Sequence, residues 1–245
     1  LTDMARWGIG ESNEFFSVRE YRTGDPLRRI HWGLTAHRGF PVVREHTRST
    51  VGDLFLVLDP YRYALLGFGR GSSLEQSVKI AASLSAWFLD RGHRVRLVAE
   101  GQRALDVPSG RGKAQLRAIL DALVEVRPDG DVPLEDLLDR RLREVSAGGT
   151  IVMMVSPYLQ RSRRFASQVV ALRRRGVRVV LAVFDASTFQ SLYDLADPEF
   201  TAGAFVQKAR ALGARAYLIP CGGDLPEIFA ERSPVPAAAT AGGSG

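Results

Sequence analysis

The side chains best placed for chemistry stand at the ends of apolar runs. Leu54–Asp59 is an apolar run that closes on a carboxylate, Thr150–Val155 is a second apolar run, and Val177–Phe184 is a third that leads directly into Asp185. Runs of this length predict buried strands of a parallel sheet, and ligands of such sheets bind beyond the carboxyl ends of the strands. We therefore expect binding chemistry at Asp59, in the loop after the second run, and at Asp185.

A glycine-rich loop, Gly67–Ser73, lies between the first apolar run and the next predicted helix. Backbone N–H groups in such a loop, together with a helix N-terminus, can cradle a phosphate. The glycine spacing matches neither the dinucleotide fingerprint nor the P-loop, and no lysine follows the glycines. The preferred interpretation is a flexible loop that ends in a serine cap. An anion- or nucleotide-binding domain built on Gly67–Gly71 is kept as an alternative.

Nucleophilic catalysis has little support in the sequence. No Gly-x-Ser-x-Gly motif is present, and no paired carboxylates or metal-type Cys/His spacings stand out. His93 falls in a predicted helix-to-strand turn, where we expect it to be solvated. Cys221 is the single cysteine, so no internal disulfide can form, which fits a reducing cytoplasm. We interpret this cysteine as a small apolar side chain and predict that the chain is not an enzyme.

The elements that must position these residues alternate regularly after residue 50. Apolar patterning predicts strands over 54–59, 95–99, 104–107, 150–155, 177–184 and 215–219, and helices over 74–91, 113–126, 162–175, 201–212 and near 225–229, with another helix that starts at Pro133. Helix 113–126 is expected to turn Leu116, Ile119, Leu120 and Leu123 inward. Strands that alternate with helices predict an α/β fold, a doubly wound and mostly parallel sheet flanked by helices.

The charge of the chain is basic, with a formal net charge of +6, and most of the basic residues are arginines. The densest patch, Arg161, Arg163, Arg164 and Arg173–Arg175, falls largely on the polar side of a predicted helix. No stacking aromatic or groove-reading motif accompanies it, so we predict no nucleic-acid partner.

The beginning of the chain suggests a piece of a longer protein. No apolar run approaches the roughly 20 residues of a membrane span, and no signal peptide is visible. The chain starts at Leu1, with Met4 close behind. We expect a missing native N-terminus, and a membrane contact only through an anchor upstream of it.

The segment before residue 50 has a different character, because polar residues are dense in it. Asp25 is suited to cap a helix that has Pro26 in its first turn. Gly39 would end that helix, and Phe40–Glu45 would return as an extended strand. We favour a structural network of ion pairs and caps that docks this segment on the main sheet. A functional surface patch is the alternative.

This segment carries a specific pattern, Arg-x-Tyr-x-x-Gly-Asp-x-x-Arg-x-Ile-x-Trp, followed by an Arg-Gly pair and a Val-Val-Arg-Glu run. The pattern resembles the signature of the bacterial family called domain of unknown function 58 (DUF58), which continues into a region similar to a von Willebrand factor A domain. The residues that carry the resemblance are Arg19, Tyr21, Gly24, Asp25, Arg28, Ile30, Trp32, Arg38, Arg44 and Glu45. It implies a signature segment over 1–50 and a von Willebrand A-like domain over 51–232, after which a tail over 233–245 is expected to be disordered.

The resemblance also implies a divalent-cation site, in which the first loop of a von Willebrand A domain supplies Asp-x-Ser-x-Ser, the second a Thr and the third an Asp. In this chain Tyr61 and Tyr63 replace both serines, Val132 stands at the threonine position, and the third loop reads Ser156-Pro157-Tyr158 without an aspartate. Hard cations require several converging oxygens. We therefore expect Asp59 to be a vestige of a metal site, with Arg62 supplying a positive charge where the metal would sit, and we expect no cofactor; Mg²⁺ is the alternative.

The resemblance finally implies a partner, because DUF58 genes commonly stand beside genes for MoxR-type AAA+ ATPases. Family members often carry an N-terminal membrane hairpin, with the conserved part expected in the cytoplasm, and in the full-length protein at the inner face of the membrane. Our hypothesis is a non-catalytic protein-interaction or adaptor domain, and the alternative is a cation-dependent binding domain. Tyrosine and arginine suit interfaces, and the predicted binding rim consists of Asp59, Tyr61, Arg62, Tyr63, Asp131, Ser156 and Tyr158.

Overall fold

The computed structural model describes residues 17–20, 35, 40–45, 53–189, 201–223 and 228. Several predicted features lie outside these ranges: seven signature residues between positions 21 and 38, the helix expected after Asp25 (apart from residue 35), the helix expected near 225–229 (apart from residue 228) and the tail over 233–245. Arg19 falls on β1 (Ser17–Glu20), and Arg44 and Glu45 fall on β2 (Val42–Glu45), which pairs antiparallel with β1. The strand expected over Phe40–Glu45 is therefore confirmed in its second part.

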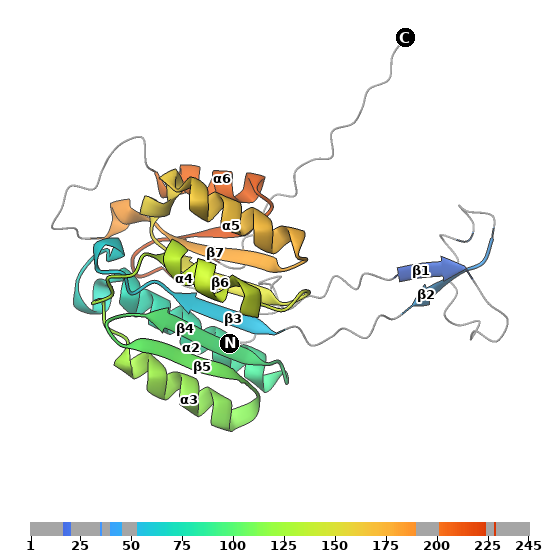
Figure 1. The fold of residues 1–245 in the computed structure, drawn as a ribbon, viewed down its shortest axis with the longest axis horizontal. Coiled ribbons are helices and arrows are strands. Elements are labelled where there is room, and N and C mark those ends of the chain that lie inside the picture. Colours follow the sequence, from blue (N-terminus) through green and yellow to red (C-terminus); the bar gives the residue numbers. More distant parts are fainter. Residues whose placement is uncertain are drawn as a thin grey trace, which may run out of the picture.

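A six-stranded sheet forms the centre of the domain, in the order β5-β4-β3-β6-β7-β8 (Figure 1). All neighbouring pairs are parallel except β4 and β5, which are antiparallel. The strands are β3 (Leu54–Leu58), β4 (Val95–Glu100), β5 (Ala104–Gly110), β6 (Thr150–Val155), β7 (Arg178–Phe184) and β8 (Arg215–Ile219). The predicted hairpin partner of the second strand is thus confirmed, and it extends to Gly110.

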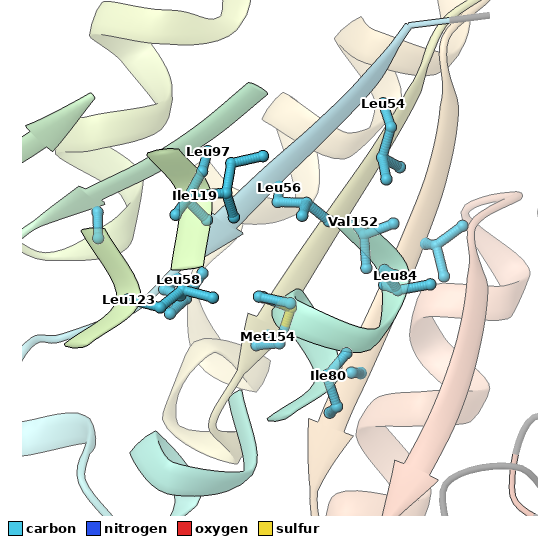
Figure 2. Packing of buried hydrophobic residues seen from close by; sticks show 14 of the residues in the cluster. Leu54, Leu56, Leu58, Ile80, Leu84, Leu97, Ile119, Leu123, Val152 and Met154 are labelled. Carbon is cyan, nitrogen blue, oxygen red and sulfur yellow. The ribbon is translucent and has the colours of Figure 1, made fainter. Parts of the chain in front are cut away.

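Helices cover both faces of the sheet. Successive residues of a strand point to opposite sides, so these apolar strands present an apolar surface on each face. α2 (Ser73–Asp90) and α3 (Gly112–Glu125) pack on the face that includes Leu56, as Figure 2 shows. α4 (Leu134–Arg141), α5 (Arg163–Arg174) and α6 (Ala202–Ala211) pack on the face that includes Val57. Both side chains are fully buried, and each such burial stabilises the fold by roughly 1.5–3 kcal/mol.

The ends of α2 follow local rules that the sequence makes visible. The hydroxyl of Ser72 accepts a hydrogen bond from the Glu75 amide at 3.2 Å, so this serine caps the helix as predicted. Gly92 follows the helix with φ of +78°, a conformation that favours glycine. No helix within the described ranges is both long and apolar enough to cross a membrane.

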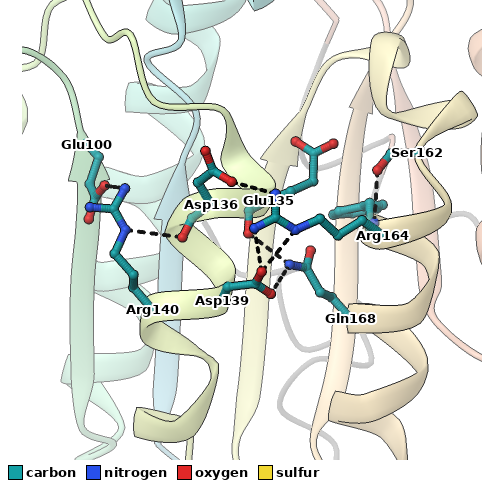
Figure 3. A network of polar contacts seen from close by, with 9 residues as sticks. Glu100, Glu135, Asp136, Asp139, Arg140, Ser162, Arg164 and Gln168 are labelled. Atoms are coloured by element: carbon teal, nitrogen blue, oxygen red, sulfur yellow. Dashed lines mark hydrogen bonds and ion pairs between the residues drawn. The ribbon is translucent and has the colours of Figure 1, made fainter.

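A polar network joins α4 to α5 on the surface of the domain (Figure 3). The Arg164 guanidinium donates to the carboxylates of Asp136 and Asp139, and Gln168 Nε2 donates to the Glu135 carbonyl at 2.8 Å. Nearby, Arg140 pairs with the buried carboxylate of Glu100 at 2.8 Å. This network positions the N-terminal turn of α4, which is close to the end of β3.

On the outer edge of β8, an arginine side chain hydrogen-bonds to a backbone carbonyl that no neighbouring strand of the described structure pairs with. The Ile219 carbonyl accepts from the Asp185 amide on the β7 side, so strand alternation turns the Ala216 carbonyl away from β7. The Arg210 guanidinium donates to that carbonyl from Nε at 3.1 Å and from a terminal nitrogen at 2.8 Å.

One predicted core position is wrong. Ile119 and Leu123 are buried and Leu116 is partly buried, but Leu120 is 41% exposed. Its i+4 neighbour, Val124, is 69% exposed. The apolar stripe of α3 is therefore wider than the face that the sheet and α2 cover.

Candidate functional site

The candidate site lies where the strand order reverses. From β3 the chain proceeds outward to β4 and β5, whereas from β6 it proceeds the opposite way to β7 and β8. Adjacent strands that lead apart in this manner leave a crevice at their carboxyl ends. Asp59 follows β3 and Ser156 follows β6, so both residues flank this point.

Asp59 has both carboxylate oxygens engaged by protein donors. The Tyr61 amide donates to Oδ1 at 3.2 Å, and the Tyr158 hydroxyl donates to Oδ2 at 3.0 Å. The pKa of Asp59 is raised from 3.8 to about 7, because burial and, to a lesser extent, the nearby charge of Glu135 raise it by more than the two hydrogen bonds lower it. Near neutral pH this carboxyl is therefore partly protonated, unlike an ordinary surface aspartate.

Three tyrosine rings form a cluster that begins beside this carboxyl at Tyr158. The rings of Tyr61 and Tyr63 meet edge to face with centroids 5.4 Å apart, and those of Tyr61 and Tyr158 lie 6.0 Å apart. Tyr63 is 74% exposed and Tyr158 is 38% exposed, so the cluster faces solvent. Burial, followed by the charge and hydrogen bond of Asp59, raises the pKa of Tyr158 far above its ordinary value, so this phenol keeps its proton.

Arg62 is held by the second loop rather than by Asp59. Its guanidinium donates to the Asp129 carbonyl at 3.1 Å and pairs with the Asp131 carboxylate at 2.8 Å. The structure pairs the charge of Arg62 with Asp131, and its placement at a metal position stays a prediction. The two loops are joined by their backbones, because the Arg62 amide donates to the Gly130 carbonyl and the Gly130 amide donates to the Pro60 carbonyl, each at 3.0 Å.

Gly130 is required for this contact between the loops. A Cβ atom at this position would lie 2.6 Å from the Glu100 carbonyl oxygen and 3.1 Å from the Pro60 carbonyl oxygen. Only glycine allows such an approach of three backbone segments.

The oxygens at this point do not fit the cation site of a von Willebrand A domain. The Ser156 hydroxyl donates to the Ala64 carbonyl at 2.5 Å, and both Asp59 oxygens already accept hydrogen bonds. Across the described part of the chain, no three His, Cys, Asp or Glu side chains converge as metal ligands would. The donor set therefore suits hydrogen bonding between protein groups better than coordination of a hard cation.

The glycine-rich loop uses its amides internally. The Gly71 and Ser72 amides donate to the Phe68 and Gly69 carbonyls of the loop, and the Ser73 amide donates to the Leu66 carbonyl just before it. The Ser72 hydroxyl accepts from the first turn of α2, as described above. This arrangement is a capped turn. Its amides already donate to backbone carbonyls, so they are not directed at a phosphate.

The remaining candidates serve as packing or capping groups. The Asp185 carboxylate accepts from the Ser187 amide at 3.2 Å and caps a short 3-10 helix. His93 is half-buried, with its ring 5.0 Å from that of Phe88. The Cys221 thiol lies 3.4 Å from the Gly71 carbonyl oxygen.

The structure brings together the predicted rim in two groups: Asp59 with the tyrosines, and Arg62 with Asp131. Sequence reasoning missed Glu135, one carboxylate oxygen of which is buried without a hydrogen-bond partner in the described structure. It also missed Asp129 and Gly130. An Asp-Gly-Asp run is an ordinary turn signal, and it gives no indication that this turn contacts the loop after β3.

The strand order and the helices on both faces define a doubly wound, mostly parallel α/β domain, and the predicted fold class is confirmed. The solved structure of conserved hypothetical protein BatB from Bacteroides thetaiotaomicron is similar with a TM-score of 0.54 and 11% identity, covering 73% of this chain and 95% of that one. A von Willebrand factor type A structure from Catenulispora acidiphila is similar with a TM-score of 0.43 and 14% identity, covering 73% of this chain and 40% of that one. At these identities the likeness concerns the fold alone.

The family model described as "Protein of unknown function DUF58" matches residues 17–214, and the chain belongs to this family. Uncharacterized protein Rv1480 from Mycobacterium tuberculosis (strain H37Rv) is 30% identical over 114 residues, which are 45% of this chain and 35% of that protein. Uncharacterized protein Mb1516 from Mycobacterium bovis matches with the same figures. The match thus spans about a third of the length of these relatives.

Proposed function

We propose that this chain is a non-catalytic protein-binding domain whose recognition surface is the rim at the carboxyl ends of β3 and β6. The observation that carries the proposal is the solvent-facing tyrosine cluster around Asp59, a carboxyl whose oxygens are already hydrogen-bonded. Exposed Tyr side chains contribute large contact areas together with hydrogen-bonding groups. Such a surface binds through shape and hydrogen bonds instead of through a bridging cation.

The charged part of the rim supports the same function. Arg62 is held in one orientation by Asp131 and by the Asp129 carbonyl, so less side-chain freedom is lost when a partner binds. Arg62 is itself 39% exposed and Asp131 is 69% exposed. A partner can therefore contact this ion pair beside the tyrosines.

The proposed partner is a MoxR-type AAA+ ATPase, for which the chain would act as an adaptor. This assignment rests on the DUF58 resemblance, in which genes of the two kinds stand side by side. The absence of enzymatic activity and of a bound cation is part of the proposal.

The test is a binding measurement between purified chain and the MoxR-type ATPase of the same bacterium, by biolayer interferometry. Tyr63→Ala and Arg62→Ala should each weaken binding by about 10-fold or more, as truncation of an interface hot spot does. Arg117→Ala is a matched control, because Arg117 is an exposed residue on α3, away from the rim. Undiminished binding in both rim variants would remove the rim from the interface.

A thermal-shift measurement tests the two alternatives. A ligand of the folded state must raise the melting temperature, so millimolar Mg²⁺ and nucleotides should leave it unchanged. A shift with Mg²⁺ that Asp59→Ala abolishes would instead support a cation-dependent domain.

A further inference from the structure

An apolar groove runs between α2 and α3, on the face of the sheet opposite α4 and α5. Its volume is about 720 Å³, within the range of ligand sites. The floor is apolar and comes from both helices, with Val78 of α2 beside Leu123 of α3. In Figure 1 these two helices lie on the same side of the sheet.

Large apolar side chains stand exposed along this groove. Phe68 is 51% exposed, and it lines the groove together with Leu120 and Val124. Elsewhere in residues 53–189 and 201–223, the exposed large apolar or aromatic side chains are Tyr63 and Tyr158 in the rim and Leu218 on β8. Exposed apolar groups gathered in one concave surface are typical of an interaction site, whereas single ones are not.

The charges at the groove indicate which charge a bound segment should carry. Arg70 and Arg127 line it, and the one carboxylate among its lining residues is Glu75. Arg127 donates to the Val124 and Val126 carbonyls, and no ion pair within the described structure neutralises either arginine. Both arginines belong to loops at the carboxyl edge of the sheet, so the positive charge lies at one end of an apolar surface.

The groove also adjoins the rim along the chain. Arg127 precedes Gly130 by three residues, and Gly130 joins the loop that bears Arg62. One partner can therefore contact both surfaces at the same edge of the domain.

We propose that the α2–α3 groove binds an amphipathic helical segment of a partner protein, with apolar side chains on one face and acidic residues beside Arg70 and Arg127. A helix packed into a groove between two helices buries an i, i+3, i+4, i+7 stripe against the apolar floor, while carboxylates on the segment compensate the two arginines. This inference deepens the proposed function, because it assigns part of the partner's chemistry.

The test uses three matched synthetic peptides of 15 residues and needs no ATPase. The first has Leu at helical spacing with Glu at its flanks, the second replaces each Glu by Lys, and the third replaces each Leu by Ala. Fluorescence anisotropy should show the first binding on the order of 10-fold more tightly than either of the others.

Variants of the chain locate the binding. The double variant Leu120→Gln/Val124→Gln should lose binding of the first peptide, whereas Leu218→Gln, which alters an exposed leucine outside the groove, should retain it. Arg70→Glu should reduce or reverse the preference for the acidic peptide over the basic one. Since these side chains are exposed, the melting temperature should stay close to that of the wild type, which verifies folding.

Three outcomes would overturn the inference: equal binding of acidic and basic peptides, an unchanged preference in Arg70→Glu, or unchanged binding in the double variant. Self-association by sedimentation equilibrium that the double variant abolishes would also overturn it, since the occupant would then be a second copy of this chain. Loss of ATPase binding in the rim variants is a separate measurement. The proposal for the groove and the proposal for the rim can therefore be rejected independently of each other.

Discussion

The phenol of Tyr158 and the carboxyl of Asp59, 99 positions apart in the chain, share a hydrogen bond of 3.0 Å across the carboxyl ends of β3 and β6. A proton donor from the loop after β6 thus meets the carboxyl that directly follows β3. The physical properties of the site follow from burial of a carboxyl beside neutral hydroxyls.

The first prediction concerns the pH dependence of stability. The pKa of Asp59 is about 7 in the folded chain against 3.8 for the ordinary group, so between pH 4 and 7 the folded state holds a proton that the unfolded state has released. Stability therefore falls as the pH rises through this window. At about 1.4 kcal/mol per pKa unit, the loss is at most about 4 kcal/mol at pH 8.

Asp59→Asn removes this titration and keeps an oxygen that accepts from Tyr158. Urea unfolding should show the variant gaining stability over wild type from pH 5 to pH 8. The comparison must use the difference between the two proteins, because other carboxyls such as Asp139, whose pKa is lowered by Gln168 and Arg164, titrate in both. A difference that does not vary with pH would contradict the raised pKa.

The second prediction isolates the hydroxyl of Tyr158. Tyr158→Phe removes a donor from the half-buried Asp59 carboxyl, which should cost roughly 1.5–3 kcal/mol above pH 7, where the acceptor is charged, and about 1 kcal/mol at pH 5. It should also raise the pKa of Asp59 above 7 in an NMR titration. Tyr63→Phe is the matched control: Tyr63 is 74% exposed, so an effect below about 0.5 kcal/mol is expected.

The third prediction concerns Gly130. Gly130→Ala places a methyl group 2.6 Å from the Glu100 carbonyl oxygen, so the loop must move and its two backbone hydrogen bonds with the loop after β3 weaken. We expect a loss of roughly 2 kcal/mol or more, measured by urea unfolding. Gly203→Ala serves as the opposite case, since Gly203 lies on α6 with no close neighbour for a Cβ, and it should gain roughly 0.5–1 kcal/mol.

The fourth prediction concerns the buried carboxylate of Glu100. Arg140→Met leaves that carboxylate without its partner at 2.8 Å, which should cost roughly 1–3 kcal/mol. Glu100→Gln/Arg140→Met should recover much of this loss, because the amide carries no charge to compensate. Arg117→Met is the control, as its ion pair with Asp121 is exposed on both sides; an equal loss there would show that helix composition, not the buried charge, is responsible.

Sequence patterning was sufficient for the architecture. Apolar runs such as Thr150–Val155 and capping residues such as Ser72 act locally, so strands and helix starts could be predicted to within a few residues. The exposure of Leu120 could not be predicted, because periodicity gives the centre of an apolar helix face but not how much of that face the neighbouring elements cover. The position of Asp59 also followed from pattern, as the last residue of a buried run.

The contacts across the site could not be predicted in the same way. The partner of Arg62 depends on the backbone pairing at Gly130, and the influence of Glu135 on Asp59 depends on where α4 starts after that loop. Both are tertiary relationships between segments about 70 residues apart, and no spacing rule within either segment encodes them.

The guanidinium of Arg210 has a consequence for how copies of this domain behave when crowded. An incoming polypeptide that tried to lengthen the sheet beyond β8 would need the Ala216 carbonyl as an acceptor, and that oxygen is already taken. The edge strand β8 is therefore a poor template for the addition of further strands, even where many copies of the domain are crowded together. Loss of the Arg210 side chain would free this acceptor on the outer edge of β8.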